Sequence, residues 1–241
     1  MTRVRADQLL VARGLVASRA RAQVEIAAGH VTSAGVAVEK PSALLNDDAP
    51  LVLTDAMPWV SRGAPKLIQA LDHFAIDVTG AVAMDIGAST GGFTEVLLAR
   101  GAARVFAVDV GHGQLHRTLA GDPRVVSLEG RDIRVLTAND VPQVDVVTID
   151  VSFIGLQKVL EPALAFLKSG GTLVALVKPQ FEVGPDHVGK GGIVRDVAAR
   201  QTAIERVAAW VGERCDLLGV IESPITGGDG NEEALLAARR R

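Results

Sequence analysis

Residues 85–94, which read Asp-Ile-Gly-Ala-Ser-Thr-Gly-Gly-Phe-Thr, have the composition of a ligand-binding loop. An apolar run precedes them and a helix-like run follows, so they are expected to join a strand to a helix N-terminus, where doubly wound α/β folds bind nucleotides. The glycine spacing fits neither the G-x-G-x-x-G dinucleotide motif nor the G-x-x-x-x-G-K-S/T phosphate loop. The leading carboxylate would repel a pyrophosphate, whereas it suits a ligand with a positive charge and an amino-acid moiety. S-adenosylmethionine has both, and its predicted contacts here are Asp85, Gly87, Ser89, Thr90, Gly91, Gly92 and Phe93.

Charged residues also stand where three other apolar runs end. Asp109 follows Val108, twenty-two residues after Gly87, at a position where a carboxylate binds ribose hydroxyls in this class of fold. Asp150 follows the run 144–149, and Lys178 follows the run 172–177. A single charge at a strand end is usually only solvated, but three in register with one glycine loop predict a site. Asp109 and Asp150 are therefore predicted as further contacts of the cofactor.

Asp132 leaves two interpretations open. It lies in the loop after the apolar run 125–128, where its carboxylate could meet the adenine edge of the cofactor. It also directly precedes the residues Ile-Arg-Val-Leu, so it could equally serve as a helix N-cap.

Strand-like and helix-like segments alternate from residue 64 onward. Strands are expected at 81–86, 104–108, 125–128, 144–149, 172–177, 216–222 and 233–238, and helices at 66–74, 93–99, 154–167 and 197–213. This alternation is typical of an α/β fold with a Rossmann-like, mostly parallel, seven-stranded sheet. Ligands bind such sheets at the carboxyl ends of the strands, so the glycine loop and the charged strand ends should meet at one edge.

The first 58 residues form a smaller α+β segment that begins with a basic stretch. Helices are expected at 6–13 and 19–28, and short strands at 31–32, 36–38 and 50–53. Residues 1–24 carry five arginines against one aspartate, or +4, so the remainder of this −3 chain carries −7. A basic module on an acidic chain is expected to face a polyanion, although a solvated helix face would also explain the charge.

Composition indicates a globular protein of a reducing compartment. Of the 241 residues, 48% are hydrophobic and 22% are charged, which excludes a disordered or fibrous chain. The single cysteine, Cys215, excludes an intramolecular disulfide. No apolar run approaches the ~18 residues of a membrane span, and the N-terminus lacks the apolar core of a signal peptide. We therefore expect a cytoplasmic protein without membrane contact, and we predict no metal site.

Several longer motifs resemble the TlyA family. They include Ser61-Arg-Gly-Ala-Pro-Lys66-Leu, the glycine loop with its following helix, Ala107-Val-Asp-Val-Gly111, Asp150-Val-Ser-Phe-Ile154, Val177-Lys-Pro-Gln-Phe-Glu-Val-Gly184 and Val188-Gly-Lys-Gly-Gly192. The resemblance implies an S-four-like RNA-binding domain at 1–58, a linker at 59–63 and an FtsJ-like class I methyltransferase domain at 64–241. It also implies methyl transfer from S-adenosylmethionine to the 2′-hydroxyl of a cytidine in ribosomal RNA, with ribosomal subunits as partners.

The resemblance further implies a Lys-Asp-Lys-Glu catalytic tetrad, which the motifs place at Lys66, Asp150, Lys178 and Glu233. Lys178 is expected to hold or remove the proton of the hydroxyl, with Lys66 or a water as the other candidates, while the two acids orient the lysines. Because neighbouring residues of a strand face opposite sides, only one of Glu232 and Glu233 points inward. The preceding asparagine, Asn231, sets a register that favours Glu233.

Basic and amide side chains in both segments are the candidates for RNA contacts. The predicted RNA-binding residues are Arg3, Arg5, Arg19, Arg21, Gln23, Arg62 and Lys190. One competing function is a non-catalytic ribosome-assembly factor, but every position of the tetrad is filled here. The other is membrane lysis, since the family has long been labelled haemolysin, but the helices lack a strongly basic amphipathic stripe.

Overall fold

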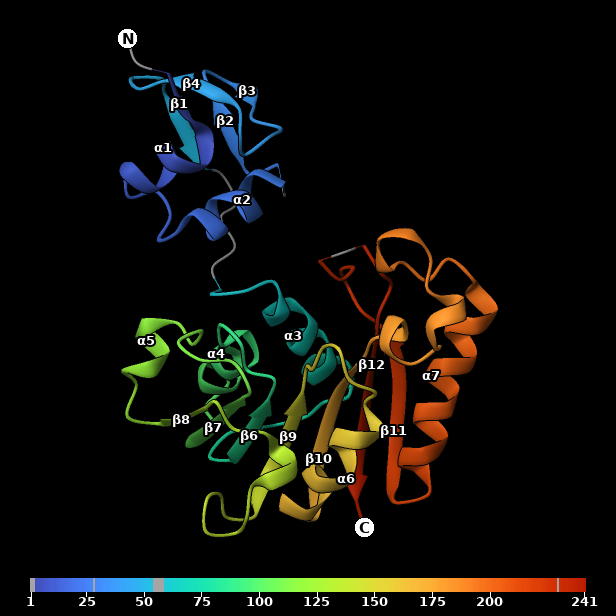
Figure 1. Cartoon of the computed structure of the whole chain (residues 1–241). Coiled ribbons are helices and arrows are strands. Elements are labelled where there is room, and N and C mark those ends of the chain that lie inside the picture. The colour runs from blue at the N-terminus through green and yellow to red at the C-terminus, as the bar shows by residue number, and fades with distance from the viewer. Residues whose placement is uncertain (1–2, 28, 54–58, 229) are drawn as a thin grey trace. The chain divides into compact units, whose positions relative to one another are not determined.

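The chain divides into two compact units, Met1–Pro58 and Trp59–Arg241 (Figure 1). The computed structural model describes residues 3–27, 29–53, 59–228 and 230–241. The predicted end of helix 19–28 at residue 28, and the predicted domain limits at residues 1 and 58, lie outside the described residues. Residues 59–63, the expected linker, belong to the second unit, because Trp59 and Val60 pack against its core.

The N-terminal unit packs two helices against short antiparallel strands. Its elements are β1 (Arg3–Arg5), α1 (Ala6–Ala12), α2 (Arg19–Ala27), β2 (Val31–Ser33), β3 (Val36–Ala37), β4 (Leu44–Asn46) and β5 (Leu51–Leu53). β1 pairs with β4, and β2 lies between β3 and β5. Leu10 of α1 and Ile26 of α2 meet Val31 and Val38 in one buried core. The sequence analysis did not predict β1 and β4, which contain the polar residues Arg3, Arg5 and Asn46.

The second unit is built on one seven-stranded sheet in the order β11-β12-β10-β9-β6-β7-β8. Strand β12 runs antiparallel to both of its neighbours, and the pairs from β10 to β8 are parallel. The elements are α3 (Gly63–His73), β6 (Val82–Ile86), α4 (Gly92–Ala99), β7 (Arg104–Asp109), α5 (Arg117–Ala120), β8 (Val125–Glu129), β9 (Val144–Ile149), α6 (Gln157–Phe166), β10 (Leu167–Val177), α7 (Val197–Gly212), β11 (Cys215–Glu222) and β12 (Ala234–Arg240). The predicted mostly parallel, seven-stranded α/β sheet is therefore confirmed.

Helices cover both faces of this sheet, which explains its continuous apolar strands. Leu67 of α3 and Leu97 of α4 belong to one core with strand residues such as Leu235. Leu160 of α6 and Val207 of α7 belong to a second core. In the described part of the chain, no helix is long and apolar enough to cross a membrane.

Several boundaries differ from the sequence prediction, and helix α3 begins at Gly63, three residues before the predicted start. Helix α6 begins at Gln157 rather than at residue 154, because the residues before it form a loop in which Phe153 has a φ of +63°. Strand β10 begins at Leu167, directly after α6, and its pairing with β9 shifts register between Leu167 and Thr172. The short helix α5 is also absent from the prediction.

Candidate active site

The glycine loop lies against the carboxyl end of strand β9. Gly87 follows β6 with a φ of +82°, and a Cβ atom there would stand 2.2 Å from the carbonyl oxygen of Asp150. Gly91 has a φ of +96° and precedes α4 as its N-cap. Ser89 and Thr90 are exposed between these glycines. The loop therefore offers exposed backbone at a helix N-terminus, which fits a ligand that needs close backbone approach.

Two residues assigned to the cofactor stand behind this loop instead of on its surface. The carboxylate of Asp85 is fully buried and accepts hydrogen bonds from Thr94 (2.7 Å) and Thr148 (3.1 Å). Burial raises the pKa of Asp85 to about 7. The ring of Phe93 is buried in the core under the loop. The carboxylate of Asp85 is thus not exposed to a ligand.

Asp109, at the end of β7, joins two loops. Its carboxylate accepts hydrogen bonds from the backbone N–H of Ser89 and of Gly111, both at 2.7 Å. Each carboxylate oxygen has a further lone pair, and the side chain is only partly buried. Asp109 can therefore fix the glycine loop and still accept hydrogen bonds from the hydroxyls of a sugar.

The next strand end contains a residue that the sequence analysis did not single out. Glu129 ends β8 beside Asp109 and accepts hydrogen bonds from the backbone N–H of Leu115 and Gln114, which lower its pKa. Asp132 caps the 3₁₀ turn Ile133–Val135 and pairs with Arg134, as the N-cap interpretation predicts. Glu129 has the same signal as the other strand-end acids, and it could have been found by that rule.

Lys178 and Asp150 form an ion pair at the carboxyl edge of the sheet. The Lys178 Nζ atom lies 2.6 Å from an Asp150 carboxylate oxygen and donates a hydrogen bond to Ser152 Oγ at 2.9 Å. These residues directly follow the neighbouring strands β10 and β9. Because Gly87 approaches Asp150, this pair also borders the glycine loop.

Lys66 and Glu233 form a second, buried ion pair, in which the Lys66 ammonium donates to the Glu233 carboxylate. Lys66 comes from α3, and Glu233 directly precedes β12, the strand beside β10. The residues 178 and 233 both stand one position beyond the paired residues Val177 and Ala234. The four predicted tetrad positions therefore form two lysine–carboxylate pairs, three of whose members stand at adjacent strand ends.

The orientation of the two neighbouring glutamates agrees with the predicted register. Glu233 is buried, whereas Glu232 is exposed and pairs with Arg200 at 2.5 Å. The buried amide of Asn231 accepts from the backbone N–H of Val194 and donates to the carbonyl of Gly192. These bonds fix the turn before β12 and direct Glu233 inward.

An exposed aromatic residue stands beside the Lys178–Asp150 pair. Phe153 is 92% exposed, has a φ of +63° and contacts the ring of Phe181, with 5.2 Å between centroids. Glu182 accepts a hydrogen bond from the backbone N–H of Leu156 at 2.6 Å and so ties the Phe153 loop to the segment after Lys178. Sequence analysis missed Phe153, because exposure and left-handed backbone leave no trace in composition.

Four of the seven predicted RNA-binding residues contact acidic side chains, which the sequence alone does not show. Arg5, Arg19 and Gln23 all donate to the buried carboxylate of Asp7. Arg21 pairs with Glu25 at 2.6 Å. The remaining three are exposed; they are Arg3, Arg62 and Lys190. Among the described residues, no group of three metal-ligating side chains is present.

The similarity of this chain to known proteins identifies its family. A model of the FtsJ-like methyltransferase family matches residues 59–240. The Mycobacterium tuberculosis protein named 16S/23S rRNA (cytidine-2'-O)-methyltransferase TlyA is 47% identical over 241 residues, which cover 98% of this chain and 90% of that protein. The chain belongs to the TlyA family.

Other TlyA-like proteins agree along the whole length. YqxC of Bacillus subtilis is 43% identical over 236 residues, covering 96% of this chain and 84% of that protein. The solved structure of a Streptococcus thermophilus protein that carries the label hemolysin has a TM-score of 0.78 at 39% identity and covers 100% of this chain and 89% of its own. Membership in the TlyA family confirms the predicted methyltransferase and its cofactor, S-adenosylmethionine.

Proposed function

We propose that this protein methylates the 2′-hydroxyl of a cytidine in ribosomal RNA, within a ribosomal subunit of the cytoplasm. The observation that carries the proposal is the Lys178–Asp150 pair beside the glycine loop, at the sheet edge where α/β folds bind ligands. The name of the Mycobacterium tuberculosis relative supports the substrate, because that protein is 47% identical over nearly the whole chain.

The glycine loop and the acids near it fit S-adenosylmethionine as the methyl donor. S-adenosylmethionine, when bound, supplies an electrophilic methyl group. We assign its binding to the backbone of Gly87–Gly91 and to the carboxylates of Asp109 and Asp132. Three further residues support the loop from the side of the core: Asp85, Gly92 and Phe93. Asp85 anchors the start of α4 through its hydrogen bond from Thr94. Gly92 has no room for a side chain, because a Cβ there would meet Ser61.

The tetrad handles the proton of the acceptor. A ribose hydroxyl is a weak nucleophile, so its proton must leave as its oxygen attacks the methyl carbon. We assign to Lys178 Nζ, which lies between Asp150 and Ser152, the orientation of the hydroxyl. An ammonium has no free lone pair, so Lys178 takes the hydroxyl proton only after it has passed one of its own protons to Asp150 or to water. Lys66 and Glu233 neutralise each other in a buried position and support the neighbouring strand end. Lys66 and a water remain the alternative acceptors.

The target base needs a contact of its own, and Phe153 is suited to it. Stacking of a base on an aromatic ring is worth roughly 1–3 kcal/mol. The exposed ring of Phe153 lies on the same loop as Asp150 and Ser152, and the ring of Phe181 contacts it. We assign Phe153 to stacking on the target cytosine.

The N-terminal unit supplies affinity for the RNA backbone. Its first 24 residues carry +4, and the rest of the chain is net acidic. We assign phosphate contacts to the side chains of Arg3, Arg5, Arg19, Arg21 and Gln23 in this S-four-like unit, and to Arg62 and Lys190 in the methyltransferase unit.

Mapping of ribose methylation tests the proposal. Sites of 2′-O-methylation are mapped on both large ribosomal RNAs from cells with the gene, without it, and complemented with wild-type protein or with Lys178→Ala. We expect at least one methylated cytidine to disappear with the gene, to return with the wild type and to stay absent with the variant. Identical maps with and without the gene would overturn the proposed substrate.

A further inference from the structure

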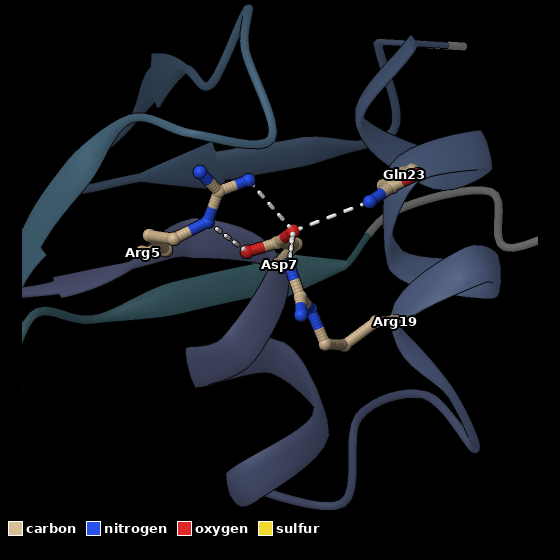
Figure 2. Close-up of polar contacts among 4 residues, drawn as sticks. All are labelled: Arg5, Asp7, Arg19 and Gln23. Atoms are coloured by element: carbon tan, nitrogen blue, oxygen red, sulfur yellow. Dashed lines mark hydrogen bonds and ion pairs between the residues drawn. The ribbon is translucent and has the colours of Figure 1, made fainter.

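A buried carboxylate stands at the centre of the basic residues of the N-terminal unit. Asp7, in the first turn of α1, is fully buried, and Figure 2 shows two guanidinium groups and one amide converging on it. Arg5 donates through Nε and Nη2 to both of its oxygens at 3.0 Å. Arg19 and Gln23, from α2, donate to the same oxygen at 3.0 and 3.3 Å. One acid therefore joins residues of β1 and α2.

Both arginines remain accessible to a ligand. The side chains of Arg5 and Arg19 are 38% and 52% exposed. A guanidinium has five N–H donors, of which Asp7 accepts two from Arg5 and one from Arg19. Three donors of Arg5 and four of Arg19 are thus left for other acceptors.

Asp7 can change the affinity for an anionic ligand in two opposite ways. The hydrogen bonds from Arg5 hold the pKa of Asp7 well below its usual range, so the carboxylate is ionised and cancels one positive charge. By charge alone, Asp7 should weaken RNA binding. A free arginine, however, loses conformational entropy when it is fixed on a phosphate, and an arginine already held by a carboxylate has lost it beforehand.

We propose that Asp7 is a positioning residue for RNA binding, which holds the Arg5 and Arg19 guanidinium groups in one arrangement before they contact phosphates. The proposal rests on the proposed RNA-binding function of the N-terminal unit. A second buried acid repeats the arrangement, because Glu25 pairs with Arg21 at 2.6 Å and with His30 at 2.7 Å. The unit thus uses its buried acids to order its basic side chains.

A matched pair of charge-removing variants separates positioning from charge. Asp7→Asn and Asp48→Asn each remove one negative charge from the same unit, but Asp48 is exposed. Affinity of the full-length chain for purified 16S and 23S rRNA is measured against KCl concentration. We expect Asp48→Asn to bind as tightly as wild type or up to about twofold tighter, and Asp7→Asn to bind at least ~5-fold more weakly. Equal affinities of the two variants would overturn the proposal.

A double-mutant cycle shows whether Asp7 acts through the arginines. In the Arg5→Ala/Arg19→Ala background, adding Asp7→Asn should weaken binding no further. An additional loss of the same size would mean that Asp7 only supports the fold and would overturn the positioning role. If the arginine pair alone has no effect on affinity, the proposed RNA-binding function of this unit is what fails.

A measurement on the wild-type chain covers the case in which Asp7→Asn does not fold. The order parameter of the Arg5 Nε–H group is measured by NMR in the free chain and with a short double-stranded RNA. We expect a high value in both states, because Asp7 already fixes the group. A low value that rises only on RNA binding would overturn the proposal.

Discussion

Strands β9 and β10 carry a lysine–aspartate pair at each of their two ends. Where both strands end, Lys178 lies 2.6 Å from Asp150, and near where both begin, Lys168 lies 2.7 Å from Asp145. The residue types, the strands and the separations are nearly the same. The exposures differ: 13% and 23% for the first pair, against 45% and 40% for the second.

The surroundings of the two pairs explain why only one is a candidate catalytic centre. Asp150 touches the glycine loop at Gly87, and Ser152 binds the same lysine. Asp145 instead caps the backbone N–H of Val82 at the start of β6. In a parallel sheet, ligand-binding loops gather at the carboxyl ends, so position along the strand gives an ion pair its function.

Substitution of the two lysines should have the largest and most unequal effects on catalysis. We expect Lys178→Ala to lower the rate of methyl transfer at least ~100-fold, because it removes the group assigned to the hydroxyl proton. Lys168→Ala should change the rate by less than about 2-fold, since exposed pairs contribute little. Transfer of labelled methyl groups to rRNA measures both, with S-adenosylmethionine affinity as the control for the fold. Equal losses would remove the distinction between the two ends.

Two glycines extend the comparison to the backbone. Gly87 and Gly170 both have positive φ, but a Cβ on Gly87 would meet the Asp150 carbonyl, whereas one on Gly170 has open space around it. Gly87→Ala should lower S-adenosylmethionine affinity at least ~10-fold, while Gly170→Ala should lower only the melting temperature. Calorimetric titration and thermal unfolding give the two quantities. Unchanged affinity in Gly87→Ala would contradict the assigned cofactor loop.

Two exposed apolar side chains, Phe153 and Leu218, should differ in their effect on the KM for RNA. Phe153→Ala should raise the KM for RNA roughly 10-fold, in line with the loss of one stacked base. Leu218→Ala, on the edge strand β11, removes a side chain that is also exposed and should leave this KM unchanged. A kcat effect of Phe153→Ala without a KM effect would argue against base stacking.

The smallest expected effects are on the pH dependence of stability. As the pH rises, the contribution of Asp85 to stability decreases and that of Asp145 increases. Burial raises the pKa of Asp85 from 3.8 to about 7, so its contribution is full below pH 3.8 and is lost as the pH rises through 7. Lys168 lowers the pKa of Asp145, so its contribution is present at neutral pH and is lost as the pH falls below about 4.

Thermal unfolding of two variants between pH 3 and pH 8 checks these signs. Asp85→Asn should gain melting temperature over wild type as the pH rises from 4 to 8. Asp145→Asn should lose a little melting temperature at neutral pH, and the difference from wild type should shrink as the pH falls toward 3. The effect is small at every pH, because the Asp145–Lys168 pair is partly exposed to solvent. Parallel curves for wild type and Asp85→Asn would show that Asp85 does not titrate in this range.

Sequence patterns predicted the sheet because its strands are long apolar runs, buried on both faces by helices. They also predicted which strand ends carry charge, since a charge after an apolar run is visible in the sequence. They could not show that Lys66 pairs with Glu233, because these residues are 167 positions apart. Nor could they show that Asp85 points inward, because a strand-end aspartate looks the same whether it faces solvent or two threonines.

The N-terminal unit shows a different limit of sequence analysis. Counting charges treated Asp7 as one negative charge among five arginines. The structure makes it the shared partner of Arg5 and Arg19. A sum of charges contains no information about which groups touch. The pairing depends on α1, which directly follows β1, packing against α2 in the unit's own core.

The position of β12 has a consequence for the order of events during folding. Strand β12 follows β11 in the chain but lies between β11 and β10, so β11 joins the sheet only through β12. Glu233 directly precedes β12, and its partner Lys66 is among the first residues of α3. Closing the loop between such distant residues costs conformational entropy, which the contact must offset. The chain therefore completes its tetrad only when the final hairpin docks, and a partly folded chain that already binds its cofactor would still lack catalysis.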